Sequence, residues 1–118
     1  MMHRPILALL LTALPLALPM AARAASFDCA RASHADERAV CADRALNDRD
    51  VTMSVLYRLD QRFVPMGSRD VIRRDQAAWL GRRRACGANT ACLARTYDRR
   101  IAELQAVIDS RVYPRGPF

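Results

Sequence analysis

Four cysteines behind an apolar leader constrain this chain of 118 residues more than any other feature. The leader contains an uncharged apolar run over residues 6–22, preceded by a short positive start. Ala22-Arg23-Ala24 then places small residues at the two positions that a signal peptidase recognises. The run is shorter than the roughly 20 residues that a membrane span needs. We therefore predict a cleavable signal peptide over residues 1–24.

The part behind the leader, residues 25–118, is of a size that folds as one domain. It carries 17 arginines and no lysine against 12 acidic residues, which gives a formal charge of +5. Its apolar residues are abundant and periodic, which excludes a disordered chain. We expect a single domain whose core covers about residues 27–111.

All the cysteines lie in this domain: Cys29, Cys41, Cys86 and Cys92. An even number in a small exported domain indicates two disulfides. Local pairing is favoured, because Cys86 and Cys92 flank a turn-rich stretch, and Cys29 and Cys41 flank a short helical segment. The pairs would then be Cys29–Cys41 and Cys86–Cys92, although the sequence leaves the other two pairings open.

Two other uses of the cysteines fit less well. Their spacings contain no C-x-x-C pair, and His34 is the one histidine of the domain, so we predict no metal site. Ser26-Phe27-Asp28 before Cys29 lacks the small apolar residues that precede a lipidated cysteine. We therefore expect neither zinc nor a lipid anchor.

Apolar residues recur at helical spacing in four segments, and no stretch alternates as a strand does. Asp43 is a candidate N-cap, as are Ser33 and Ser68, and Gly87 is a candidate helix stop. The predicted helices cover residues 34–42, 44–64, 69–85 and 91 to about 111. The sequence therefore predicts an all-α fold, a small antiparallel bundle of one short and three longer helices stapled by two disulfides.

The apolar stripes of these helices define the expected core. They include Tyr57, Gln76, Trp79, Leu80, Arg83, Tyr97 and Ile101. The stripe of the second helix ends at Phe63 or Val64. Arg83 needs either a buried partner, for which Asp50 is the candidate, or a stem that packs while its tip reaches water.

Arginines cluster in three places: Arg73-Arg74, Arg82-Arg83-Arg84 and Arg99-Arg100. They form either a basic face for anionic components of the cell envelope or an ordinary solvated surface, since acidic residues are interleaved with them. Aromatic residues for base stacking are few, and export argues against nucleic acid as a partner.

Candidate catalytic groups are few. His34, the side chain best suited to general acid–base catalysis, falls in a first helical turn, where a surface residue is expected. The carboxylate pairs Asp36/Glu37 and Asp48/Asp50 are typical of helix caps and helix faces. We predict no catalytic residue and no cofactor, so the chain is not expected to be an enzyme.

A larger set of residues resembles one known family. Its first part is Phe27-Asp28-Cys29, Glu37 and Val40-Cys41-Ala42-Asp43, with Asp50 seven residues before Tyr57. Its more specific part is Gln76, Trp79-Leu80, Arg83, Cys86-Gly87-Ala88, Ala91-Cys92-Leu93, Tyr97 and Arg100-Ile101-Ala102-Glu103-Leu104. Over about residues 27–104 the chain is similar to the lysozyme inhibitor LprI-like domain. Arg49 departs from the pattern, since the family usually has an apolar residue there.

The resemblance implies a small helical domain of the bacterial envelope, periplasmic or secreted, in which the four cysteines are structural. It also suggests lysozyme as the partner. Inhibition by blocking a cleft needs a rigid projecting feature, and the turns at residues 65–68 and 87–91 are the candidates. Lysozyme in its common animal form is strongly basic, so we expect a locally acidic contact face from Asp43, Asp48 and Asp50. The alternative is an accessory module that holds anionic envelope components on its arginines.

Overall fold

The computed structural model describes residues 25–111, so the predicted leader lies outside the described residues. Within this range the chain forms one short 3-10 helix and four α-helices, without a strand. The elements are η1 (Cys29–Arg31), α1 (Ala35–Ala42), α2 (Arg44–Phe63), α3 (Met66–Ala85) and α4 (Thr90–Arg111). The predicted all-α fold, with one short and three longer helices, is confirmed.

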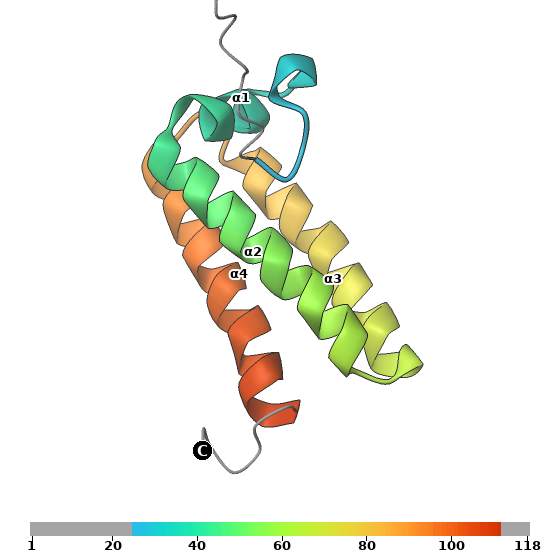
Figure 1. The fold of residues 1–118 in the computed structure, drawn as a ribbon. Helices are drawn as coiled ribbons and strands as arrows, with labels where there is room; N and C mark the ends of the chain where they lie inside the picture. The colour runs from blue at the N-terminus through green and yellow to red at the C-terminus, as the bar shows by residue number, and fades with distance from the viewer. Residues whose placement is uncertain (1–24, 112–118) are drawn as a thin grey trace, which may run out of the picture.

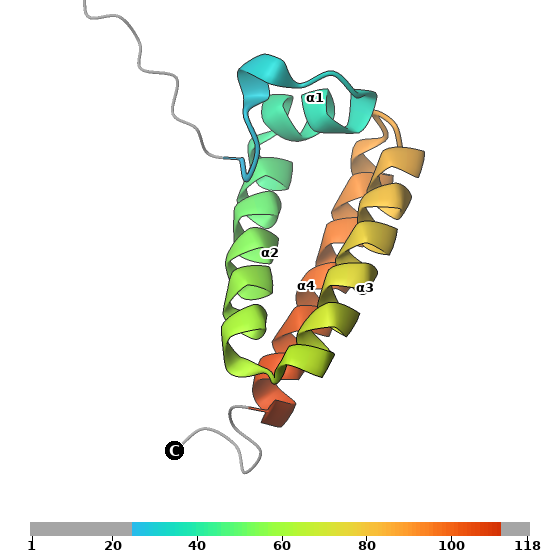
Figure 2. The ribbon, with the colours of Figure 1, turned by 90° about the vertical axis from the view of Figure 1, so that its right-hand side faces the viewer.

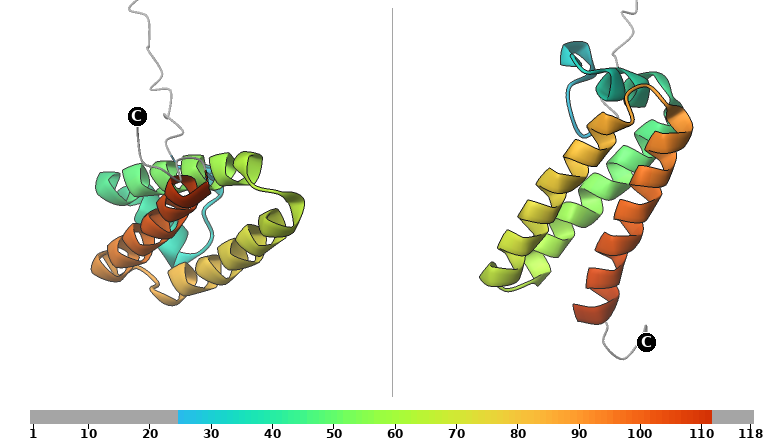
Figure 3. Two further views of the ribbon diagram at one scale, coloured as in Figure 1. Left: turned by 90° about the horizontal axis from the view of Figure 1, so that it is seen from below. Right: turned by 180° about the vertical axis from the view of Figure 1, so that it is seen from behind.

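The three long helices lie side by side, and α1 lies across one end of them (Figure 1). Helices α2 and α3 run antiparallel and are joined by a tight turn at the end far from α1 (Figure 2). Helix α3 returns the chain to the end that α1 covers, and α4 starts from there, so α2 and α4 run in the same direction (Figure 3). One end of the bundle therefore carries α1 and the α3–α4 turn, and the other carries the α2–α3 turn.

The boundary between α1 and α2 follows the predicted cap. The side-chain oxygen Oδ1 of Asp43 accepts a hydrogen bond from the backbone nitrogen of Leu46 at 3.0 Å. Ser33 was the wrong cap for α1, because His34 takes that position. The carboxylate of Glu37 accepts from the backbone nitrogens of Ser33 at 3.0 Å and His34 at 3.3 Å. These hydrogen bonds hold the pKa of Glu37 below its ordinary value.

Helix α3 begins earlier than the sequence predicts, and Ser68 is not its cap. Pro65 is the N-cap and Met66 the first helical residue, because the extended backbone and fixed φ of the proline lead directly into a helix. Val64 closes the apolar stripe of α2 as a buried residue, whereas Phe63 is 54% exposed.

The core is one cluster of buried apolar side chains along the bundle: Val40, Leu46, Met53, Val64, Ile72, Trp79, Leu93, Tyr97 and Leu104. The rings of Trp79 and Tyr97 meet edge to face, with centroids 5.1 Å apart. Tyr57 and Ile101 are half-buried and pack against this cluster. Leu80 was wrongly assigned to the core, since it is 43% exposed. It follows Trp79 by one residue and so points about 100° away around the helix.

Two disulfides staple the domain, in the pairing favoured by the sequence. The Cα atoms of Cys29 and Cys41 are 5.8 Å apart, and those of Cys86 and Cys92 are 5.6 Å apart. None of the cysteines within residues 25–111 is free.

Replacing each cysteine pair by serine should destabilise the fold by the entropy that the closed loop removes from the unfolded chain. The loops span 12 and 6 residues. We expect losses of about 3 kcal/mol for Cys29/Cys41 and about 2 kcal/mol for Cys86/Cys92. Urea unfolding of the two double variants measures both. Unchanged unfolding midpoints would show that the bridges do not stabilise this bundle.

Candidate functional site

The α3–α4 connection, residues 86–92, lies at the end of the bundle that α1 covers (Figure 2), and we call it the stapled turn. Its ends are joined by the Cys86–Cys92 disulfide. Gly87 has a φ of +54°, in the left-handed region that glycine adopts without a side-chain clash, as commonly occurs after a helix. The side-chain oxygen of Asn89 accepts a hydrogen bond from the backbone nitrogen of Cys92 at 2.9 Å and so caps α4. The disulfide and the Asn89 cap therefore constrain the turn, and Gly87 permits the backbone conformation that it adopts.

The tip of the stapled turn consists of exposed small and polar residues: Ala88, Asn89, Thr90 and Ala91. Beside it, between the beginnings of α2 and α4, lies a hollow of about 260 Å³. Asp43, Arg49 and Thr90 are among the residues that line this hollow. The tip and the hollow together give this end of the molecule an exposed, disulfide-closed turn with a recess next to it.

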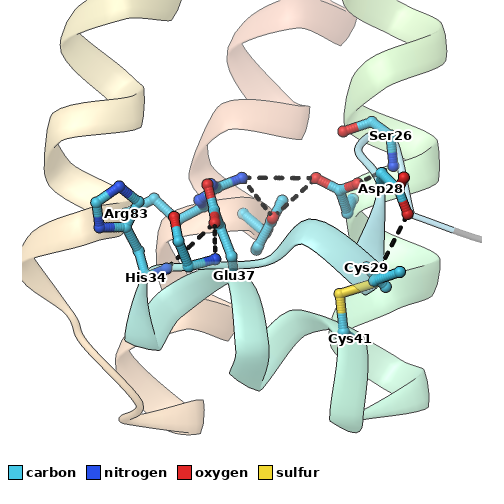
Figure 4. The surroundings of a disulfide bond; sticks show 11 residues. Ser26, Asp28, Cys29, His34, Glu37, Cys41 and Arg83 are labelled. Carbon is cyan, nitrogen blue, oxygen red and sulfur yellow. Dashed lines mark hydrogen bonds and ion pairs between the residues drawn. A yellow bond between two sulfur atoms is a disulfide. The ribbon is translucent and has the colours of Figure 1, made fainter.

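A buried polar network lies beneath the stapled turn and consists of Asp36, Arg83, Tyr97 and Asp50. Arg83 donates from Nε to Asp36 at 2.8 Å and from an NH group to the Tyr97 hydroxyl at 3.3 Å. The Tyr97 hydroxyl donates to Asp50 at 2.8 Å. The second carboxyl oxygen of Asp50 accepts from the backbone nitrogen of Ser26, and dashed lines in Figure 4 mark these contacts. The network joins all four helices to the N-terminal segment.

Aromatic rings enclose the guanidinium of Arg83. Its central carbon lies 5.3 Å from the ring centroid of Phe27 and 5.7 Å from that of Trp79, within the range of cation–π attraction. The indole nitrogen of Trp79 donates to the backbone oxygen of Thr96 at 3.0 Å, which fixes α3 against α4. Arg83 precedes Cys86 by three residues, so these contacts also anchor the base of the stapled turn.

The protonation of the network follows from its burial. Burial opposes the charge on Arg83, but Tyr97 and Asp36 outweigh it, and the pKa of Arg83 is raised. Burial, with the neighbouring carboxylate of Asp50, also raises the pKa of Tyr97. The guanidinium therefore stays charged and the phenol stays protonated, as their hydrogen bonds require. The donors and acceptors of the network point inward and bind one another. The network therefore has a structural role: it holds the base of the stapled turn in place.

The predicted partner of Arg83 was correct in part. Asp50 lies 3.9 Å from an Arg83 nitrogen, but Asp36 is the closer partner at 2.8 Å. Since Asp50 is fully buried, its assignment to an acidic contact face was wrong. Asp48 is exposed and Asp43 half-buried, and these two remain at the stapled end of α2.

The predicted basic face loses two of its arginines to the interior. Arg83 belongs to the buried network, and Arg100 donates from Nε to Gln76 at 3.0 Å between α3 and α4. The others are exposed: Arg73, Arg74, Arg82, Arg84 and Arg99. His34, the candidate catalytic base, is exposed at the start of α1.

Three buried charged residues were missed as core residues, although their spacing carried a signal. Asp36 lies four residues before the buried Val40, and Asp60 four residues before the buried Val64. Arg100 lies between Tyr97 and Leu104 on the buried stripe of α4. Each occupies a core position of its helix, which indicates burial whatever the side chain.

Asp60 is a buried carboxylate without a hydrogen-bond partner. Neither of its carboxyl oxygens has a hydrogen-bond partner. Burial raises its pKa from 3.8 to about 6, against the opposing influence of Arg100. The folded chain therefore binds this proton more tightly than the unfolded chain does, and the free energy of unfolding should fall as the pH rises from about 4 to about 6.

Asp60→Asn should accordingly stabilise the domain at pH 7, on the order of 1 kcal/mol, and flatten this pH dependence. Thermal unfolding of both proteins at pH 4 and pH 7 measures the effect. Asp48→Asn, an exposed change on the same helix, is the control and should leave the pH dependence unchanged. A lower stability of Asp60→Asn at pH 7 would show that the carboxylate has a favourable partner.

Comparison with known proteins gives no relative: no family model, no curated protein and no solved structure matches the chain. No helix within residues 25–111 combines the length and the apolar character needed to cross a membrane. The two most distinctive features of the described domain are the stapled turn, which a disulfide closes, and the buried polar network beside it.

Proposed function

We propose that this chain is an exported, non-enzymatic binding protein of the bacterial envelope, and that it inhibits lysozyme by placing the stapled turn in the lysozyme cleft. The resemblance to the lysozyme inhibitor LprI-like domain supports the partner. The signal-like leader and the two disulfides support export, since disulfides persist in oxidising compartments.

The observation that carries the proposal is the rigidity of the stapled turn. A flexible segment loses conformational entropy when it becomes ordered in a cleft, and this loss weakens the affinity of the inhibitor. Here that segment is held by a disulfide, a capped helix start and a network of buried hydrogen bonds. Its exposed residues are short, so the backbone itself can approach a partner closely.

Charge sets a condition on this mode of binding. A domain with 17 arginines against 12 acidic residues is repelled at long range by a basic lysozyme. Asp43 lines the hollow beside the stapled turn together with Arg49, and Asp48 is exposed in the first half of α2. Short-range contacts at this end then provide the attraction, while the rest of the surface slows the encounter.

A lysis assay on a bacterial cell-wall suspension tests the assignment of the turn. Ala88→Arg adds bulk and charge at the exposed tip, and we expect it to weaken inhibition by about tenfold or more, as for a change at the centre of an interface. Ala78→Arg makes the same change at an exposed position on α3 and should inhibit as the wild type does. Equal inhibition by all three proteins would place the contact elsewhere.

The arginines of α3 favour a second candidate, an accessory module that holds anionic envelope components. Arg73, Arg74, Arg82 and Arg84 are all exposed on this helix. Binding to isolated cell wall that weakens steeply with added salt would support this function. Absent or salt-insensitive binding would contradict it.

A further inference from the structure

The α2–α3 turn, at the end of the bundle far from the stapled turn, exposes an apolar tip. Phe63 ends α2 and is 54% exposed, and Met66 begins α3 and is 77% exposed. Val71, little more than one turn further along α3, is 45% exposed. These three side chains, which we call the apolar corner, are half of the six large apolar residues exposed in the described domain. Exposed apolar side chains gathered at one turn indicate a site that binds another molecule or a membrane.

The surface behind the apolar corner is also apolar. A hollow of about 300 Å³ lies there, and its apolar lining is Val64, Val71, Ile72 and Val107. Ser68, Asp75 and Arg111 also line this hollow. The tip therefore continues into a mainly apolar recess that one carboxylate and one guanidinium border.

Arginines surround the corner. Residues 61–75 contain four arginines and two aspartates. One of these aspartates, Asp70, lies 3.5 Å from Arg73 in an ion pair within the helix. Arg62, next to Phe63 on α2, and Arg74, on α3, are both exposed. The corner thus combines apolar side chains with a net positive rim.

This combination fits the surface of an anionic lipid bilayer. Phospholipid headgroups supply the negative charge that the arginines complement, and the acyl boundary beneath them takes up apolar side chains. The corner is a convex end of the molecule, where a tight turn joins two helices (Figures 1 and 3). A stable protein interface needs a patch of some 20 residues on each side, which a two-helix corner does not offer.

We infer that the apolar corner docks on an anionic membrane, with Phe63 and Met66 inserted at the headgroup boundary and the arginines on lipid phosphates. The contact is peripheral. The stapled turn, at the opposite end of the bundle, then points away from the bilayer and stays accessible. The inference goes beyond the proposed inhibition and does not depend on it.

Co-sedimentation with vesicles tests this inference, using the processed chain of residues 25–118 because the apolar leader would itself bind lipid. The vesicles contain equal parts of phosphatidylglycerol and phosphatidylcholine, or phosphatidylcholine alone. We expect binding to the anionic vesicles that weakens with salt, and little binding to the neutral ones. The double variant Phe63→Ser/Met66→Ser should lower the affinity for the anionic vesicles about tenfold or more.

A matched control removes two exposed apolar side chains from α2 at positions away from the apolar corner. Val51→Ser/Val55→Ser should bind anionic vesicles as the wild type does, and thermal unfolding confirms that both variants fold. Absent vesicle binding, or binding that survives Phe63→Ser/Met66→Ser, would overturn the inference. So would self-association that this variant abolishes without vesicle binding, because the corner would then be an interface between copies of the chain.

Discussion

Arg83→Met should destabilise the domain by about 3–5 kcal/mol, the usual cost of leaving buried charges without their partner. Asp36 and Asp50 are two fully buried carboxylates of the described domain. Arg83 is the cation that contacts both of them. Methionine fills much of the volume of the arginine stem but supplies no countercharge. Urea unfolding at neutral pH measures the loss.

Arg82→Met and Arg84→Met remove exposed arginines on either side of Arg83 and should each change stability by less than about 0.5 kcal/mol. If Arg83→Met unfolds at the wild-type midpoint, the network is not what holds the stapled end together.

Trp79→Ala should cost a similar amount, about 3–5 kcal/mol, through a different mechanism. Trp79 is among the largest fully buried side chains, and its ring packs against Tyr97 and beside Arg83. Alanine leaves a cavity at the centre of the bundle and deprives the backbone oxygen of Thr96 of its donor. Thermal and urea unfolding measure this loss.

Two further variants separate packing from the hydrogen bond of Trp79. Trp79→Phe keeps an aromatic ring but no donor, and we expect it to lose less than the alanine variant. Leu80→Ala changes the exposed neighbour and should cost under about 1 kcal/mol. A Trp79→Ala protein as stable as the wild type would place this side chain outside the core and reopen it as a binding residue.

The helices were predictable because their signals are local. Asp43 caps α2 and Gly87 ends α3 for reasons of backbone geometry that no distant residue alters. The disulfide pairing followed from short separations along the chain, where closing a loop costs little entropy. Ser68 was the wrong cap because Pro65, with its fixed φ, starts the next helix three residues sooner.

The candidate site was less predictable because it depends on contacts between helices. Arg83 was placed on the buried face by its spacing, but the choice of Asp36 as its closer partner depends on how α1 crosses the end of the bundle. Arg100 was assigned to a basic or solvated surface because of its charge, and Asp60 was not recognised as a core residue, although both are buried. Leu80 was assigned to the core because it lies next to Trp79 on the apolar stripe, but it points about 100° away around the helix and is exposed.

The most direct test of the proposed function is calorimetric titration of lysozyme with the oxidised chain of residues 25–118, at low and at physiological salt. We predict a one-to-one complex whose apparent affinity does not fall, and can rise, as salt screens the repulsion between two basic proteins. Ala88→Arg should weaken this complex and Ala78→Arg should not. No heat of binding at either salt concentration, even at high molar excess, together with unchanged cell-wall lysis, would contradict the account.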